Sequence, residues 1–202
     1  ADVVVRVIDA VAKFDYPAGK LDVLYVSDGS TDGTTGLIEA NLDSRSTLVV
    51  LPERSGKAAA LNAGLARARN DVVVFTDASI ALAPDALRQI VRQFAAPAVG
   101  CVSGEDVIEQ SGGEALYGRY ELYIRRQESR LHSIVGASGS FYAQRRSLCE
   151  PFEAGLAPDF LSVQERLSLR EEMAQIADLV PLGARVLYSS GLCLILGAAA
   201  LL

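Results

Sequence analysis

The chain has 202 residues, of which half are apolar and 22% are charged, and its formal net charge at neutral pH is −6. This length and composition are those of one globular domain with a sizeable core. The acidic balance argues against a nucleic-acid partner, and an anionic ligand would need a local basic pocket. The scattered Cys101, Cys149 and Cys193 predict reduced thiols in a cytosolic compartment, and the single His132 excludes a multi-histidine metal site.

The first half of the chain alternates helical and strand-like segments. Apolar residues at helical spacing predict an amphipathic helix over 1–14. Strands are then predicted at 21–26, 48–51, 72–77 and 99–103, with helices ending at 42 and spanning 57–68 and 84–94. Strands that alternate with helices predict an α/β fold with a mostly parallel sheet covered by helices on both faces.

The second half is less regular. Its predicted elements are a helix over 114–131, a small-residue loop from 136 entering a strand, a helix from 158 and a strand over 184–188. Residues 1–188 are expected to form one domain, followed by an apolar tail over 189–202. The tail is too short to cross a bilayer as a helix, which needs about 20 residues. It fits the start of a longer membrane-associated region and an ordinary core element equally well.

Asp77 follows a short apolar strand, at the point where the apolar run stops. Ligands of open α/β sheets bind at the carboxyl ends of the strands, so an acid in this position points to a ligand site. Pro84 marks the start of the next helix, so Asp77 is not needed as its cap. Together with Ser79, Asp77 offers oxygen ligands to a divalent cation whose other ligands would be water and phosphate oxygens.

Two polar turns supply further candidates. Asp28, Ser30 and Asp32 follow the first predicted strand. They either satisfy backbone groups of a turn or accept hydrogen bonds from a nucleobase and a ribose. Gly56 and Lys57 open a helix, and the positive helix end and the ammonium together suit an anion such as diphosphate. The alternative for Lys57 is a solvent-facing side chain.

Two more polar residues stand out in or beside predicted helices. Asn62 interrupts an otherwise apolar helix, and Asp159 follows Pro158 at a helix start. The structural alternative for Asp159 is a helix cap, or an acid favoured by the helix dipole.

The order of these motifs resembles the family 2 glycosyltransferases, and most closely their polysaccharide-building members such as cellulose, chitin and hyaluronan synthases. The motifs are Asp-Gly-Ser-x-Asp after a strand, Gly-Lys before Leu-Asn-x-Gly, Phe-Thr-Asp-Ala-Ser, Gly-Ala-Ser-Gly-Ser-Phe-Tyr-Ala-x-Arg-Arg, and Pro-Asp-Phe. The resemblance covers about residues 1–188. It implies a GT-A fold that acts on a nucleotide-activated sugar, with UDP as the expected carrier.

The resemblance also implies residue roles. The nucleotide-sugar site is matched by Asp28 (at the base-binding position), Ser30, Asp32, Lys57, Asn62 and Asp77. The loop that shapes the acceptor site is matched by Gly136, Ser138, Gly139 and Tyr142. Asp77 matches the first acid of the DxD motif, which holds Mg²⁺ or Mn²⁺ on the diphosphate. Asp159 matches the catalytic base of an inverting transfer.

Four features depart from the family pattern. The strand that usually opens the fold is missing before Ala1, and Ser79 stands where the second DxD acid usually lies. Asp77 is therefore expected to be the main protein ligand of the metal. Pro158 replaces the first acid of the pair that ends in Asp159, and no QxxRW motif follows Tyr188.

The sequence therefore predicts an inverting glycosyltransferase on the cytoplasmic side of the cell membrane, with a saccharide or lipid-linked acceptor. One alternative is a sugar nucleotidyltransferase, which would want an N-terminal glycine-rich loop with a basic residue. The other is a non-catalytic GT-A-like binding domain. The changes at Ser79 and Pro158 favour this second alternative, whereas the retention of Asp28, Asp77 and Asp159 argues against it.

Overall fold

The computed structural model describes residues 2–106, 120, 123, 124, 127, 137, 139–153, 181–182 and 192–198. The helices in this part of the chain are α1 (Asp2–Ala12), α2 (Thr34–Glu39), α3 (Lys57–Leu65) and α4 (Ala86–Val91), with short 3-10 segments η1 (Ala18–Lys20), η2 (Arg92–Ala95) and η3 (Arg146–Leu148). The strands are β1 (Leu21–Asp28), β2 (Ser46–Leu51), β3 (Val72–Asp77), β4 (Cys101–Ser103), β5 (Glu105–Asp106), β6 (Phe141–Arg145), β7 (Pro181–Leu182) and β8 (Leu192–Ala198).

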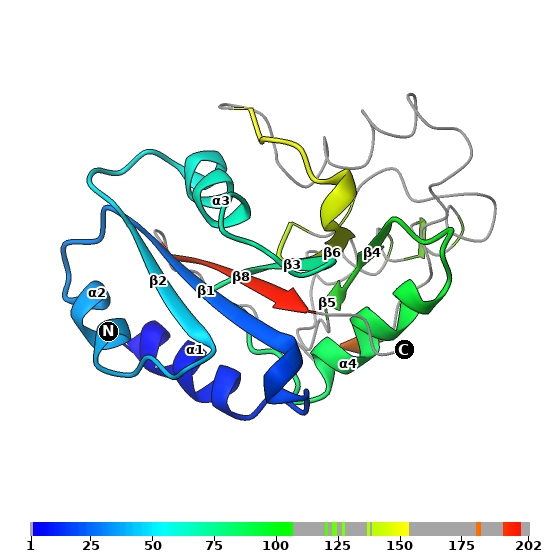
Figure 1. The fold of residues 1–202 in the computed structure, drawn as a ribbon, viewed down its shortest axis with the longest axis horizontal. Helices are drawn as coiled ribbons and strands as arrows, with labels where there is room; N and C mark the ends of the chain where they lie inside the picture. Colours follow the sequence, from blue (N-terminus) through cyan, green and yellow to red (C-terminus); the bar gives the residue numbers. More distant parts are fainter. Residues whose placement is uncertain are drawn as a thin grey trace.

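Six of these strands form one sheet in the order β2-β1-β8-β3-β6-β4 (Figure 1). Strands β1 and β2 are parallel, while β8 is antiparallel to both of its neighbours, β1 and β3, so β1 and β3 run in the same direction. Strand β6 is antiparallel to β3 and β4. Strands β2, β1, β3 and β4 therefore share one direction, and the predicted α/β class is confirmed.

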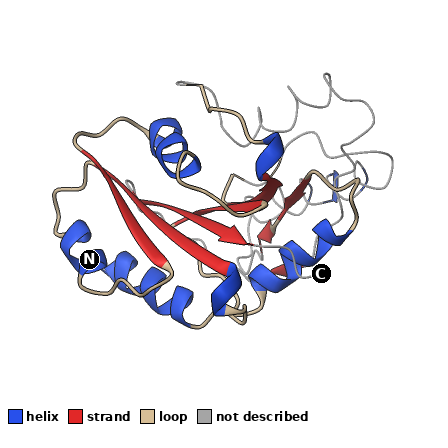
Figure 2. Ribbon diagram, viewed as in Figure 1, coloured by secondary structure: helices blue, strands red, loops and turns tan. Residues whose placement is uncertain are grey.

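The sheet is buried on both faces at strand β3, because the residues from Val72 to Phe75 are all apolar and all buried. Val72 and Val74 of β3 belong to a core cluster with α1, α2 and α4, and Val73 and Phe75 belong to a second cluster with α3. Figure 2 shows helices on both sides of the strands. This arrangement leaves the carboxyl ends of β1, β2 and β3 at one edge of the sheet.

The elements up to residue 106 follow the predicted order. All four helices are shorter than predicted. Helices α1, α2 and α3 end at Ala12, Glu39 and Leu65, and α4 begins at Ala86 and gives way to the 3-10 segment η2. Within the predicted helix over 114–131, the described residues 120, 123, 124 and 127 are helical. The predicted helix from 158 and the predicted strand over 184–188 lie outside the described residues.

The apolar tail supplies a strand in the interior of the sheet. Strand β8 pairs with β1 from Leu21↔Ala198 to Ser27↔Leu192, and with β3 up to Asp77↔Cys193. It therefore joins the β2-β1 pair to the β3-β6-β4 group. Among the described residues no helix is long and apolar enough to span a membrane.

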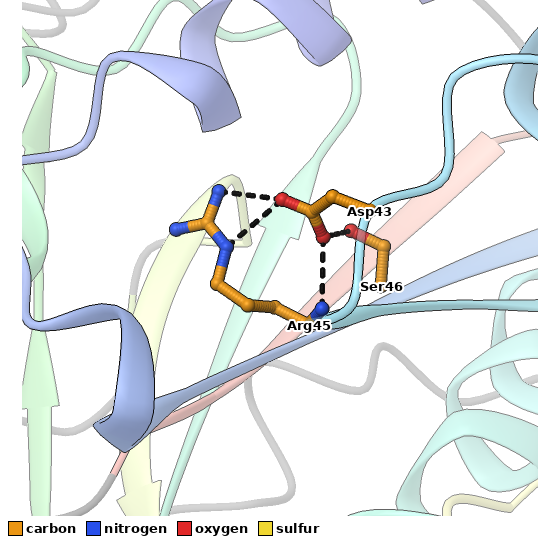
Figure 3. A network of polar contacts seen from close by, with 3 residues as sticks. All are labelled: Asp43, Arg45 and Ser46. Carbon is orange, nitrogen blue, oxygen red and sulfur yellow. Dashed lines mark hydrogen bonds and ion pairs between the residues drawn. The ribbon is translucent and has the colours of Figure 1, made fainter.

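The turn before β2 is fixed by Asp43 (Figure 3). Its Oδ1 accepts hydrogen bonds from Ser46 Oγ at 2.6 Å and from the Arg45 backbone N–H at 3.0 Å, and its Oδ2 accepts one from Arg45 Nε at 2.9 Å. The Ser46 hydroxyl, and after it Arg45, hold the pKa of Asp43 below its usual value. The stabilisation from this carboxylate is therefore present at neutral pH and is lost as the pH falls through the lowered pKa.

Candidate functional site

The candidate site lies at the sheet edge where β1 and β3 end, with Asp28 and Asp77 as their last residues. Strand β6 is antiparallel to β3, with Thr76 paired to Phe141, so the residues that precede β6 come to the same edge. The Asp77 N–H donates a hydrogen bond to the Ser140 carbonyl at 3.0 Å. Asp28 and Asp77, the two acids predicted to bind the sugar donor, therefore lie at the same edge of the sheet as the end of the predicted acceptor loop.

Asp28 is buried, with 7% of its surface exposed, and both of its carboxylate oxygens accept backbone hydrogen bonds. The Ser55 N–H donates to Oδ1 at 2.7 Å, and the Gly56 N–H donates to Oδ2 at 2.9 Å. Hydrogen bonds to an ionised acceptor are shorter and stronger than those between neutral groups. Asp28 therefore fixes the loop between β2 and α3, and with it the position of the first residue of α3.

Gly29 allows that loop to pack directly on the backbone after β1. Its φ is +61°, and a Cβ added there would lie 2.5 Å from the Arg54 nitrogen and 2.6 Å from the Glu53 carbonyl carbon. No residue other than glycine fits this close approach. Sequence reasoning did not single out Gly29, although an Asp-Gly pair in a polar turn is a signal for a special backbone conformation.

Lys57 contacts both Asp77, in the predicted donor site, and the predicted acceptor loop. It is the first residue of α3, and its Nζ lies 2.9 Å from Asp77 Oδ1 and donates a hydrogen bond to the Gly139 carbonyl at 2.9 Å. The side chains of Lys57 and Asp77 are 42% and 35% exposed, so a ligand can reach both. The lysine that the sequence placed beside a diphosphate is therefore ion-paired to the predicted metal-binding acid.

The polar turn after β1 has a structural role besides any role in binding. Asp32 accepts the Thr34 N–H at 3.2 Å, and hydrogen bonds from Thr34 lower the pKa of Asp32. Asp32 is exposed and Ser30 is half-buried. These contacts belong to the start of α2, and the predicted contacts of Ser30 and Asp32 with a nucleotide stay predictions.

Asn62 and Tyr142 are engaged within the protein. The Asn62 amide donates to the Phe152 carbonyl at 2.9 Å and accepts the Phe152 N–H at 2.7 Å, which holds the segment after β6 on α3. Tyr142 is buried in β6, and its ring stacks on Phe75 with a centroid distance of 4.8 Å. Both residues are therefore held by contacts within the protein, and their direct contact with substrate stays a prediction.

Three predicted site residues, Gly136, Ser138 and Asp159, lie outside the described residues. Their assignment to the acceptor loop and to the catalytic base rests on the sequence motifs.

The residues present fit a divalent cation that is shared with a ligand. In the described part of the chain, no group of three or more His, Cys, Asp or Glu residues could hold a metal ion. Ser79 lies in the turn after β3 and lines a cavity of about 320 Å³ beside α1. Asp77 offers a half-buried carboxylate at an open edge, and Mg²⁺ is commonly bound by one or two carboxylates together with waters and substrate phosphates.

Replacement of Asp28 with asparagine should lower the free energy of unfolding by about 1.5–3 kcal/mol. The side-chain NH₂ group of asparagine would face a backbone N–H group that now donates a hydrogen bond to the carboxylate. The free energy can be measured by denaturant titration. Asp32→Asn is the matched control, since the amide oxygen can still accept the Thr34 N–H and the residue is exposed. Equal losses in the two variants would contradict the anchoring role of Asp28.

Residues 1–152 match the family described as Glycosyl transferase family 2. An N-acetylglucosaminyltransferase of a Rhizobium species is 36% identical over 101 residues, which are 48% of this chain and 22% of that protein. A beta-monoglucosyldiacylglycerol synthase of a Synechocystis species is 31% identical over 155 residues, which are 71% of this chain and 32% of that protein. The chain therefore spans no more than about a third of these two relatives.

The fold is also similar to solved structures. A mannosyltransferase from Pyrobaculum calidifontis in complex with GDP-Man and Mn²⁺ has a TM-score of 0.75 and 30% identity, over 89% of this chain and 51% of that one. Glucosyl-3-phosphoglycerate synthase from Mycobacterium tuberculosis, in complex with phosphoglyceric acid, has a TM-score of 0.58 and 24% identity, over 81% of this chain and 60% of that one. The second likeness concerns the fold alone.

Proposed function

Because the chain belongs to glycosyl transferase family 2, we propose that it moves a sugar from a nucleotide-sugar donor to a saccharide or lipid-linked acceptor in polysaccharide biosynthesis, with inversion at the anomeric carbon. The observation that carries this proposal is the meeting of Asp77, Lys57 and Gly139 at one sheet edge, beside the loop held by Asp28. The family match argues against the nucleotidyltransferase alternative.

The proposed donor carries UDP. The base and ribose would bind near the turn after β1, and the diphosphate would reach the start of α3, where backbone N–H groups and Lys57 favour an anion. The Pyrobaculum mannosyltransferase was solved with GDP-Man, so a guanosine donor is the alternative that any assay of this chain should include.

In the proposed reaction the acceptor hydroxyl attacks the anomeric carbon, the bond from that carbon to the diphosphate oxygen breaks, and the nucleoside diphosphate leaves. Asp159 accepts the proton of the hydroxyl as general base. Lys57 orients the diphosphate, and the Asp28-held loop positions Lys57. A divalent cation on Asp77, when bound, would supply charge neutralisation to the leaving diphosphate.

The test of this proposal is a donor-turnover assay on the full-length protein. UDP-glucose, UDP-N-acetylglucosamine and GDP-mannose would each be incubated with Mn²⁺, and released nucleoside diphosphate would be measured with and without added saccharide. We expect release from at least one UDP-sugar. Release from GDP-mannose alone would contradict the UDP assignment, and no release from any donor would favour the non-catalytic alternative.

The metal requirement gives a separate prediction. With one acid at the site, we expect a weak cation requirement that Asp77→Asn removes and Ser79→Asp strengthens, because a second carboxylate adds a charged oxygen ligand. The measurement is UDP affinity by calorimetry as Mn²⁺ is varied. Asp77→Asn should lower the metal-dependent part of UDP binding by about 10-fold or more, the equivalent of one charge-assisted contact. Unchanged metal dependence in both variants would place the cation elsewhere.

We also propose that the full-length protein associates with the cytoplasmic side of the cell membrane. The Synechocystis relative is named for a diacylglycerol product, and a lipid-linked acceptor would require access to a bilayer. Cell fractionation should recover the full-length protein with membranes, and complete recovery in the soluble fraction without detergent would contradict the proposal.

A further inference from the structure

Lys57 holds two parts of the site at once. Its ammonium contacts Asp77 Oδ1 and the Gly139 carbonyl, each at 2.9 Å, and these contacts use two of its three N–H donors. The side chain is 42% exposed on a flexible four-carbon stem. The third donor and this mobility allow the ammonium to reach a ligand at the same edge without any movement of α3.

The ammonium of Lys57 and a divalent cation compete for the same carboxylate. Asp77 Oδ1 is the oxygen paired to Lys57, and a cation bound there would lie within a few ångströms of the ammonium, where like charges repel. The two cations are therefore alternative partners of Asp77. A diphosphate, by contrast, can accept hydrogen bonds from Lys57 and coordinate a metal at the same time, because its oxygens are several and charged.

We propose that Lys57 is a built-in cation of the site. It neutralises Asp77 and holds the Gly139 carbonyl while the site is empty of donor, and it moves onto the diphosphate when the donor binds. The nucleoside diphosphate is then paired with the Lys57 ammonium whether or not a metal is present. This contact compensates for the weak metal binding expected when Asp77 is the single acid. When Lys57 leaves Asp77, its hydrogen bond to the Gly139 carbonyl is broken as well, while the Asp77 N–H keeps its hydrogen bond to the Ser140 carbonyl. This inference rests on the proposed function, because the ligand it invokes is a nucleoside diphosphate.

The chain contains a close match for a control variant. Arg88 and Asp15 form an ion pair of the same length, 2.9 Å, and the Arg88 side chain is also 42% exposed. That pair joins α4 to the segment after α1, whereas the Lys57 pair lies at the candidate site. Lys57→Met and Arg88→Met thus remove the same charge from two equally exposed side chains, and only the first removes it from the site.

The experiment measures the UDP affinity of the full-length protein by calorimetry, once with a chelator and once with saturating Mn²⁺. Lys57→Met should weaken UDP binding by about 10-fold or more without metal, because it removes a charge-assisted hydrogen bond. The loss of UDP affinity in saturating Mn²⁺ should be several-fold smaller. The gain in UDP affinity on adding Mn²⁺ should therefore be larger in Lys57→Met than in wild type. Arg88→Met should leave that gain unchanged, and Lys57→Arg should restore metal-free binding. An unchanged or smaller gain in Lys57→Met would overturn the proposal.

A second measurement needs no nucleotide. This sequence contains Lys13, Lys20 and Lys57, and in a ¹⁵N-lysine sample the side-chain signal of each is identified as the one that its single variant loses. Excess Mg²⁺ should shift the Lys57 ammonium signal and leave the signals of Lys13 and Lys20 in place. A Lys57 signal that does not respond to Mg²⁺ would overturn the competition at Asp77. Absence of UDP binding under both metal conditions, with a responsive Lys57, would instead overturn the proposed donor.

Discussion

Sugar transfer by the Asp159→Asn variant should be roughly 10²–10⁴-fold slower than wild type, the usual contribution of a general base. UDP affinity and melting temperature should barely change. A base must reach the acceptor hydroxyl, which lies across the sugar from the diphosphate, so the residue contacts little of the donor. Asparagine is as good a helix cap as aspartate, so this substitution removes the basic carboxylate while a capping role is retained. Transfer rates, UDP binding and thermal unfolding would be measured on the same preparations.

Asp159→Ala provides the opposing test. If Asp159 serves only as a cap, alanine should cost about 1 kcal/mol of stability while turnover survives. If it is the base, alanine should reduce transfer as strongly as asparagine does. A near wild-type rate in Asp159→Asn would show that the carboxylate is dispensable, and the proposed mechanism would then be wrong.

Gly29→Ala should lower the free energy of unfolding by about 2–4 kcal/mol. Two costs add up in this variant. Alanine is strained in a left-handed backbone conformation, and its Cβ overpacks against the neighbouring loop. The added Cβ would lie 2.5 Å from the Arg54 backbone nitrogen, and the loop cannot rotate away as a flexible side chain would. The displaced loop would carry Ser55 and Gly56 away from Asp28, and UDP binding should weaken as well. Denaturant unfolding and UDP calorimetry measure the two effects.

Gly33→Ala separates the contributions. Gly33 also has a positive φ, +82°, but an added Cβ would meet nothing within 4 Å. This control should therefore show only the backbone cost, about 1–2 kcal/mol, and normal UDP binding. Equal stability losses in the two alanine variants would mean that the close approach of the 53–54 backbone to Gly29 contributes nothing.

Local patterns were enough to predict the elements of the first half. The helix over Asp2–Ala12 and the strand that ends at Asp77 follow from apolar spacing, which is a property of consecutive residues. Strand β1 was also predicted, although it runs two residues beyond its predicted end, to Asp28. The position of Asp77 at a ligand-facing sheet edge followed from the rule for parallel strands. Helix ends were less accurate, because α3 and α4 are shorter than their apolar runs.

Contacts between distant segments could not be predicted from the sequence. Nothing in the turn after β1 indicates that Asp28 accepts two N–H groups from the loop before α3, or that Asn62 binds the backbone of Phe152. The partner of Lys57 was equally hidden, since a lysine in a first helical turn is commonly solvated. These contacts depend on which segments the completed sheet brings together, and hydrophobic periodicity carries no such information.

The place of β8 sets the order in which this domain can be completed during synthesis. Strands β1, β2, β3, β4 and β6 all precede residue 146, yet β1 and β3 are each paired to β8 on one side. Until residues 192–198 leave the ribosome, the β2-β1 pair and the β3-β6-β4 group each expose an unpaired strand edge, the kind of surface that pairs with other chains. Because closure depends on contacts of very long sequence separation, folding should be slow, and the nascent chain should benefit from a chaperone until residues 192–198 have emerged.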